Sequence, residues 1–273
     1  MDPTLGGKSL RVVQEPSATA VCLFGSLFSN SFALESALDV ARRRGIDRIY
    51  GLGDLIGMGP HPDRALKLVL DRKIACLQGD FEFNLASGVE EVDCDFTSPG
   101  EIFLTKLSLD YTSDKLSAVH LDAIGRFPHH FRMNLGKHRL LLVHGSPVRV
   151  SESCWESREN SDFQMWFDEC HADIIACDHT GLPWSREVLP GKWLVNVGSL
   201  GRPANNGRRE GTIVLLREGP SIEFVPIEFD WKRLVEEMKS EKLSDELWKT
   251  VEEGYWQYFL DSLPPLERAR GKY

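Results

Sequence analysis

Four side chains that can bind a metal ion each stand directly after a short apolar run of the chain: Asp54, Asp80, His144 and His179. A single Asp or His in such a place is more often a cap or a satisfied polar group. Four of them at equivalent positions form a constellation of carboxylate and imidazole, and both groups are metal ligands. The arrangement therefore favours a metal site built from four separate loops.

The apolar runs before these side chains belong to a longer pattern in which apolar and helical segments alternate. Buried strands are predicted at residues 21–24, 48–52, 74–77, 140–143, 174–177 and 193–197. Strands that alternate with helices predict an α/β fold. In such a sheet, ligands collect beyond the carboxyl ends of the strands, which is where the four candidate ligands stand.

The segments between the strands carry helical signals. Residues 31–44 place apolar residues on one face, begin with capping residues and stop at Gly45. Further helices are predicted at residues 62–71, 117–124 and 162–169, a closing hairpin at 212–216 and 221–228, and a helical tail at 231–239 and 245–260.

Composition limits the class of protein. The chain has 273 residues, of which 42% are hydrophobic, so it can bury a sizeable core. Its net charge of −9 argues against a nucleic-acid backbone as the main partner. The sequence shows neither a signal pattern nor an apolar run long enough for a membrane span. Three cysteines, Cys22, Cys76 and Cys177, lie in predicted strands and are expected to be reduced core residues. A cytoplasmic location and no membrane partner are expected.

The chain divides into three parts by its pattern. Residues 1–18 are polar and turn-rich and are expected to form a flexible tail, and residues 19–230 hold the alternating pattern. Residues 231–273 form a C-terminal helical extension rich in aromatic residues: Trp231, Trp248, Tyr255, Trp256, Tyr258 and Phe259. Such a surface either packs on its own domain or forms a homodimer interface.

Five segments of the chain resemble the calcineurin-like metallophosphoesterases. The family pattern runs D-x-H, GDxxGxGP, GN-H-[DE], HGSP and GHTH, and the chain has GDLIGMGP at 53–60, GD at 79–80, HGSP at 144–147, DHTG at 178–181 and NVGSLGRP at 196–203. The resemblance covers roughly residues 20–230. It implies a four-layer α/β/β/α sandwich that holds two metals bridged by one carboxylate.

Carried over residue by residue, the resemblance predicts that one metal site is lost and the other kept. At the first site, Ser26, Phe28 and Gly181 stand where the family has Asp, His and His. The second site keeps all four of its ligands as Asp54, Asp80, His144 and His179, with Asp80 in place of Asn. Two imidazoles and two carboxylates suit Zn²⁺, Mn²⁺ or Fe²⁺. We expect at most one divalent transition metal, the alternative being a site without metal whose polar groups pair with each other.

Catalysis is expected to be impaired, because Phe81 stands where the family has a proton-donating histidine. One hypothesis is a pseudo-phosphoesterase, a binding or regulatory protein for a phosphorylated small molecule or a protein partner. The alternative is a slow single-metal phosphoesterase with a narrow substrate range, in which Asp54 and His144 would be catalytic.

Several neighbouring loop residues are secondary candidates. Arg149, Arg202 and His61 could contact a phosphorylated substrate, although each could equally form a surface contact. Glu82 matches an acidic position of the family and could supply a substitute metal ligand.

Overall fold

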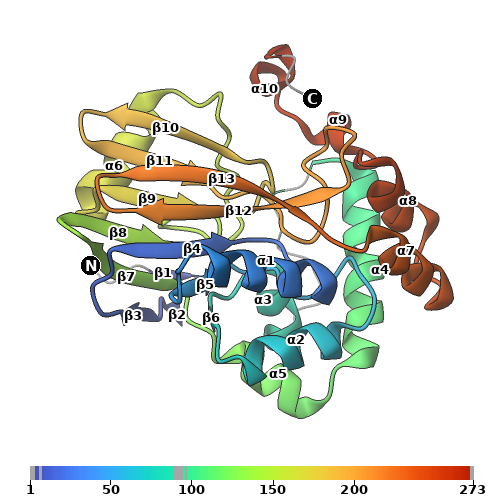
Figure 1. Ribbon diagram of the computed structural model, residues 1–273. Helices are drawn as coiled ribbons and strands as arrows, with labels where there is room; N and C mark the ends of the chain where they lie inside the picture. The colour runs from blue at the N-terminus through green and yellow to red at the C-terminus, as the bar shows by residue number, and fades with distance from the viewer. Residues whose placement is uncertain (1–3, 6–7, 89–94, 96, 271–273) are drawn as a thin grey trace.

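Two β-sheets packed face to face form the centre of the computed structural model, which describes residues 4–5, 8–88, 95 and 97–270 (Figure 1). One sheet has the strand order β10 (Trp184–Leu189), β11 (Lys192–Asn196), β9 (Ile174–Cys177), β8 (His138–Leu142), β7 (His130–Leu135) and β3 (Val12–Gln14). The other has the order β13 (Ser221–Glu228), β12 (Glu210–Arg217), β4 (Ala20–Phe24), β5 (Ile49–Gly51) and β6 (Ala75–Cys76). A separate pair joins β1 (Thr4–Leu5) to β2 (Lys8–Ser9).

Helices cover the outer faces of both sheets. The five-stranded sheet lies under α1 (Ser31–Arg43), α2 (Pro62–Asp71), α7 (Trp231–Ser240) and α8 (Asp245–Glu253), whose buried residues share one apolar cluster with β4 and β12. The outer face of the six-stranded sheet carries α6 (Asn160–Cys170). A third cluster fills the space between the sheets, with Leu23, Leu142 and Val214 among its members. The predicted four-layer α/β/β/α sandwich is therefore confirmed.

Five further helices of the described chain lie outside these layers, from α10 (Pro265–Ala269) at the top of the view to α5 (Ala118–Gly125) at the bottom (Figure 1). The others are α3 (Asp80–Ser87), α4 (Pro99–Lys115) and α9 (Phe259–Ser262). Within the sheets, β4, β5 and β6 run parallel, as do β8, β9 and β11. Their carboxyl ends are followed by the loops that carry Ser26, Asp54, Asp80, His144 and His179, so the fold delivers the candidate ligands to one edge.

Most predicted elements are confirmed, and the differences have physical causes. Helix α4 was not predicted, because polar residues such as Thr105, Ser108 and Thr112 occupy its buried face and no apolar periodicity marks it. The predicted helix at 245–260 ends at Glu253, because Gly254 adopts a left-handed φ of 79° that caps it.

Both terminal segments contact the sandwich. In the segment expected to be a flexible tail, β3 pairs in parallel with β7, and the backbone N–H of Arg11 donates to His129 Nδ1 at 2.9 Å. In the C-terminal extension, Leu234 and Met238 of α7 and Val251 of α8 are buried in the core beside α1 and α2. These two helices thus pack on their own domain.

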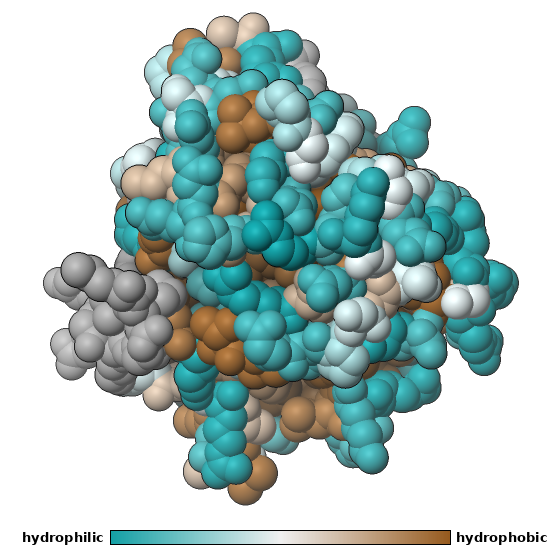
Figure 2. Space-filling model, turned by 90° about the vertical axis from the view of Figure 1, so that its left-hand side faces the viewer, coloured by the Kyte–Doolittle hydropathy of each residue, from teal (hydrophilic) through white to brown (hydrophobic). Residues whose placement is uncertain are grey.

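The surface and the cysteines agree with the composition. No helix among the described residues is long and apolar enough to cross a membrane. Figure 2 shows that hydrophilic residues cover most of the face at the sheet end of the molecule, with hydrophobic residues in small separate patches. Cys22, Cys76 and Cys177 are free and buried, as predicted.

Two buried histidines at the start of β7 give the fold a pH dependence. Burial lowers the pKa of His129 to about 4, with help from the charge of Arg11. Burial likewise lowers the pKa of His130 to about 3, with help from Arg132. The unfolded chain therefore binds protons first as the pH falls. Stability from these neutral side chains is fully present above about pH 6.5 and is lost as the pH drops below it.

We expect the free energy of unfolding in urea to fall by on the order of 2–4 kcal/mol between pH 7 and pH 5 through these two groups. The His129→Gln/His130→Gln variant should show a clearly shallower loss, whereas the exposed His171→Gln control should follow the wild type. An unchanged pH slope in the double variant would contradict this assignment.

Candidate metal centre

The loop that carries Asp54 passes unusually close to the loop that carries Asp80. Gly53 follows β5 with a left-handed φ of 104°, and a Cβ added to it would lie 2.6 Å from the Cα of Gly79. Only glycine allows this approach. Asp54 itself has a φ of 52°. Residues other than glycine rarely adopt this backbone conformation, and it is often found at functional sites.

The structure brings the four predicted ligands together in the buried interior. Ligand atoms of Asp80, His144 and His179 all lie within 4.8 Å of one another. His144 Nε2 lies 3.5 Å from Asp54 Oδ2 and 4.0 Å from Asp80 Oδ1, and His179 Nδ1 lies 3.1 Å from Asp80 Oδ2. Asp80 and the two imidazoles therefore form one cluster, and Asp54 adjoins it through His144.

His144 is oriented for metal binding by its other ring nitrogen. Its Nδ1 lies 2.7 Å from the carbonyl oxygen of Leu52, and because a carbonyl only accepts, Nδ1 carries the proton. Nε2 is then the ring nitrogen that faces the carboxylates and could bind a metal, as in many metal sites. Among the described residues, neither this Nε2 nor Asp80 Oδ1 has a hydrogen-bond partner, although both are buried. A divalent cation placed between them would bind both Nε2 and Asp80 Oδ1.

The electrostatics of the cluster also favour a cation. Burial raises the pKa of Asp54, and Asp80 adds to the rise. Burial acts on Asp80 too, but the charge and hydrogen bond of His179 outweigh it and lower the pKa of Asp80. Burial lowers the pKa of His144, yet Asp54 and Asp80 raise it to about 9. The carboxylates thus favour positive charge at the imidazoles, and a divalent ion would supply that charge in place of the ring protons.

The sequence makes Glu82 a candidate substitute metal ligand. In the structure, Glu82 supports the centre through hydrogen bonds to the backbone instead. Its two carboxylate oxygens accept four backbone N–H groups, from Asp54 at 2.9 Å, Leu55 at 2.8 Å, Ile56 at 3.3 Å and Gly79 at 2.8 Å. Burial and the charge of Asp54 raise the pKa of Glu82 to about 7. The carboxylate therefore joins the two ligand loops from within.

At the first site of the family pattern, a hydrogen bond replaces a metal ligand. Ser26 Oγ donates to Asp178 Oδ2 at 2.7 Å in the buried interior. Asp178 reaches this place because Gly25 has no side chain, since a Cβ there would lie 2.1 Å from Asp178 Cγ. The carboxylate of Asp178, from the loop after β9, thus lies beside Ser26, the position at which the family pattern has an aspartate.

Aromatic side chains occupy the rest of that site. Phe28 and Phe81, which stand at two histidine positions of the family, pack edge to face with ring centroids 5.8 Å apart. Gly181 has a φ of 66°, and a Cβ on it would lie 2.9 Å from Trp256. Trp256 therefore lies against the position of the lost third histidine. This contact could not be predicted, because the two residues are 75 positions apart in the chain.

The secondary candidates are placed differently. Arg202 lines the cavity beside Asp54, Asp80 and His179. Arg149 lies 3.8 Å from Asp95 on a half-exposed loop, and its charge helps to lower the pKa of Asp80. His61 Nε2 lies 3.7 Å from Glu237 of α7, outside the lining of that cavity.

Comparison with known proteins gives a consistent result. A model of the calcineurin-like phosphoesterase superfamily domain matches residues 21–219. An uncharacterised protein of Methanocaldococcus jannaschii is 22% identical over 241 residues, which cover 82% of this chain and 94% of that protein. A metallophosphoesterase from Sphaerobacter thermophilus superimposes with a TM-score of 0.67 at 22% identity. A hypothetical protein from Pyrococcus horikoshii OT3 gives 0.71 at 20% identity. Each structural match covers 87% of this chain and 99% of the other, and both show the fold.

Replacing Glu82 should test its role as the support of both ligand loops. In Glu82→Gln one oxygen becomes an amide donor, so two buried N–H groups lose their acceptor, and we expect a loss of roughly 2–5 kcal/mol in the free energy of unfolding. Chemical denaturation would measure it. The exposed Glu236→Gln control should change stability by less than about 0.5 kcal/mol. Equal effects of the two substitutions would show that the hydrogen bonds of Glu82 contribute little.

Proposed function

The chain belongs to the calcineurin-like phosphoesterase superfamily, whose members use divalent metals, and we propose that it is a one-metal member adapted for binding. In this proposal Asp54, Asp80, His144 and His179 hold a single divalent transition ion. The protein binds a phosphorylated ligand or partner there and has lost the hydrolysis of phosphate esters.

The observation that supports this proposal is the separation of kept and lost residues in space. Asp80, His144 and His179 form one buried cluster that Asp54 adjoins, and among the described residues Asp80 Oδ1 and His144 Nε2 have no hydrogen-bond partner. The replaced positions form a second, packed region in which Ser26 bonds to Asp178, Phe28 packs on Phe81 and Trp256 lies against Gly181. The first region is suited to a cation, whereas the second offers no replacement for the lost imidazoles.

A bound divalent ion supplies Lewis acidity and fixed positive charge for a phosphate oxygen. The chain's own residues hold and orient: Leu52 fixes the ring of His144, and Asp80 begins α3, where its carboxylate meets the positive end of the helix dipole. Leaving-group protonation has no donor at position 81, because Phe81 carries no titratable group. Losing a general acid typically slows hydrolysis by about 10²–10⁴-fold.

A slow single-metal phosphoesterase is the second candidate, favoured by the retained cluster. A metal-bound water can ionise near pH 7, so an activated ester could still be hydrolysed. Asp54 and His144 would then be the catalytic residues. The substrate would be a phosphorylated small molecule whose leaving group needs no protonation.

We expect about one equivalent of a transition metal such as Zn²⁺, Mn²⁺ or Fe²⁺ per chain, measured by elemental analysis after purification without chelators or affinity metals. His144→Ala should lose it, because both the Nε2 ligand and the orienting contact with Leu52 disappear. The exposed His171→Ala control should keep it. A wild type that binds no metal even after reconstitution would overturn the proposal.

Turnover of p-nitrophenyl phosphate decides between the two candidates. We expect the metal-loaded protein to show no hydrolysis above that of the Asp54→Ala variant. Steady turnover that disappears in Asp54→Ala and rises with metal content would instead establish the slow phosphoesterase. Turnover that survives in Asp54→Ala would mark a contaminating enzyme.

A further inference from the structure

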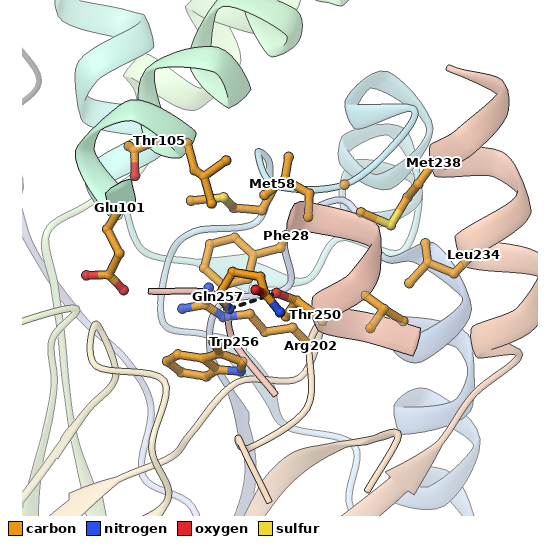
Figure 3. A pocket seen from close by; sticks show the side chains of 15 residues that line it. Phe28, Met58, Glu101, Thr105, Arg202, Leu234, Met238, Thr250, Trp256 and Gln257 are labelled. Atoms are coloured by element: carbon orange, nitrogen blue, oxygen red, sulfur yellow. Dashed lines mark hydrogen bonds between the residues drawn. The ribbon is translucent and has the colours of Figure 1, made fainter. Parts of the chain in front are cut away.

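A second cavity adjoins the metal centre on the side of the C-terminal extension (Figure 3). It is lined by α4, α7, α8 and the loop after β11. Phe28, Met58, Thr105 and Arg202 line both this cavity and the smaller one that contains Asp54, Asp80 and His179. The two cavities therefore meet at these four side chains.

Arg202 is the cation at this junction. Its guanidinium carbon lies 3.6 Å from the ring centroid of Trp256 and 4.7 Å from that of Phe28, so two aromatic rings sandwich it (Figure 3). In the described part of the chain, its side chain forms no ion pair within 4.0 Å, and its buried Nε has no hydrogen-bond partner. A partly buried cation with an unused donor favours a further anion beside it.

Arg202 interacts electrostatically with the carboxylates around it. Burial lowers the pKa of Arg202 to about 10, and Glu101, Asp54 and Asp178 oppose that fall. The guanidinium therefore remains charged at neutral pH, and it interacts electrostatically with Asp54 of the metal centre and with Asp178 beside Ser26. A guanidinium has planar, paired donors that match phosphate oxygens.

The far wall of the cavity is apolar. Leu234 and Met238 of α7 and Leu247 and Val251 of α8 line it. Glu101 of α4 is the acid in the lining, and it accepts a hydrogen bond from Ser262 Oγ. Since a second anion would be repelled near Glu101, the phosphate fits on the metal side of Arg202 and an uncharged group fits towards α7 and α8.

We propose that Arg202 takes the place of the lost metal as the second cation of a phosphate clamp, and that the C-terminal helices select ligands with an apolar body. The ligand class is an organic phosphate monoester with an aromatic or aliphatic chain. This inference rests on the proposed one-metal function, because the phosphate lies between the retained metal and Arg202. It assigns to the extension a direct part in specificity.

Binding of non-hydrolysable phosphonates to the metal-loaded full chain tests the assignment by isothermal titration calorimetry. We expect 4-phenylbutylphosphonate to bind at least about tenfold more tightly than inorganic phosphate, since several methylene groups leave water. Arg202→Met should weaken both ligands by about 10–100-fold, as expected for a charge-assisted contact. Arg208→Met, on the same loop but exposed and paired with Glu210, should leave both affinities unchanged.

Two further variants separate the clamp from the apolar wall. Arg202→Lys keeps the charge but not the planar donors and should bind phosphate with intermediate affinity. Val251→Thr keeps the shape but adds a hydroxyl, so it should reduce the preference for 4-phenylbutylphosphonate several-fold without changing phosphate affinity.

Metal content measured on the same samples separates the possible failures. If Arg202→Met retains its metal and binds both ligands like the wild type, the clamp is wrong and the one-metal proposal stands. Equal wild-type affinities for phosphate and 4-phenylbutylphosphonate overturn the apolar selectivity. A wild type without metal or phosphonate binding overturns the proposed function and this inference with it.

Discussion

The metal centre of this protein depends on one buried carboxylate, Glu82, whose hydrogen-bond partners are backbone N–H groups. Glu82 accepts four backbone N–H groups from the loops after β5 and β6. Those groups lie in the interior, where an unsatisfied donor is expensive. By satisfying them, Glu82 fixes how closely Gly53 and Gly79 approach, and so where Asp54 and Asp80 project. The geometry of the metal cluster therefore depends on Glu82. The four hydrogen bonds stabilise the Glu82 side chain in the interior, although burial raises its pKa.

Around that support, the two halves of the site have become different environments. One half gathers carboxylates and imidazoles with unused acceptor atoms and therefore attracts positive charge. The other half stacks Phe28, Arg202 and Trp256, and keeps its carboxylate, Asp178, hydrogen-bonded to Ser26. The C-terminal extension belongs to this second half, since Trp256 and the buried faces of α7 and α8 complete it. A helical tail is thus part of the site.

The sequence predicts the elements and contacts that depend on local pattern. Apolar runs ending in Gly, Asp or His place the strands and their loops, so the sandwich and the cluster of four ligands could be predicted. The packing of α4 could not, because its buried face is polar. The Ser26–Asp178 bond and the Gly181–Trp256 contact were also missed, since each joins residues far apart in the chain and neither residue type indicates its partner. The role of Glu82 depends on the direction of a side chain, which spacing does not give.

The contact between Gly181 and Trp256 has a consequence for how this chain can change. A histidine at position 181 would need a left-handed backbone and would meet the indole ring, while an aspartate at position 26 would face the carboxylate of Asp178. Each step back towards two metals is therefore unfavourable while its partner stays in place. A variant with metal-binding residues at positions 26 and 181 would therefore also need replacement of Asp178 and Trp256.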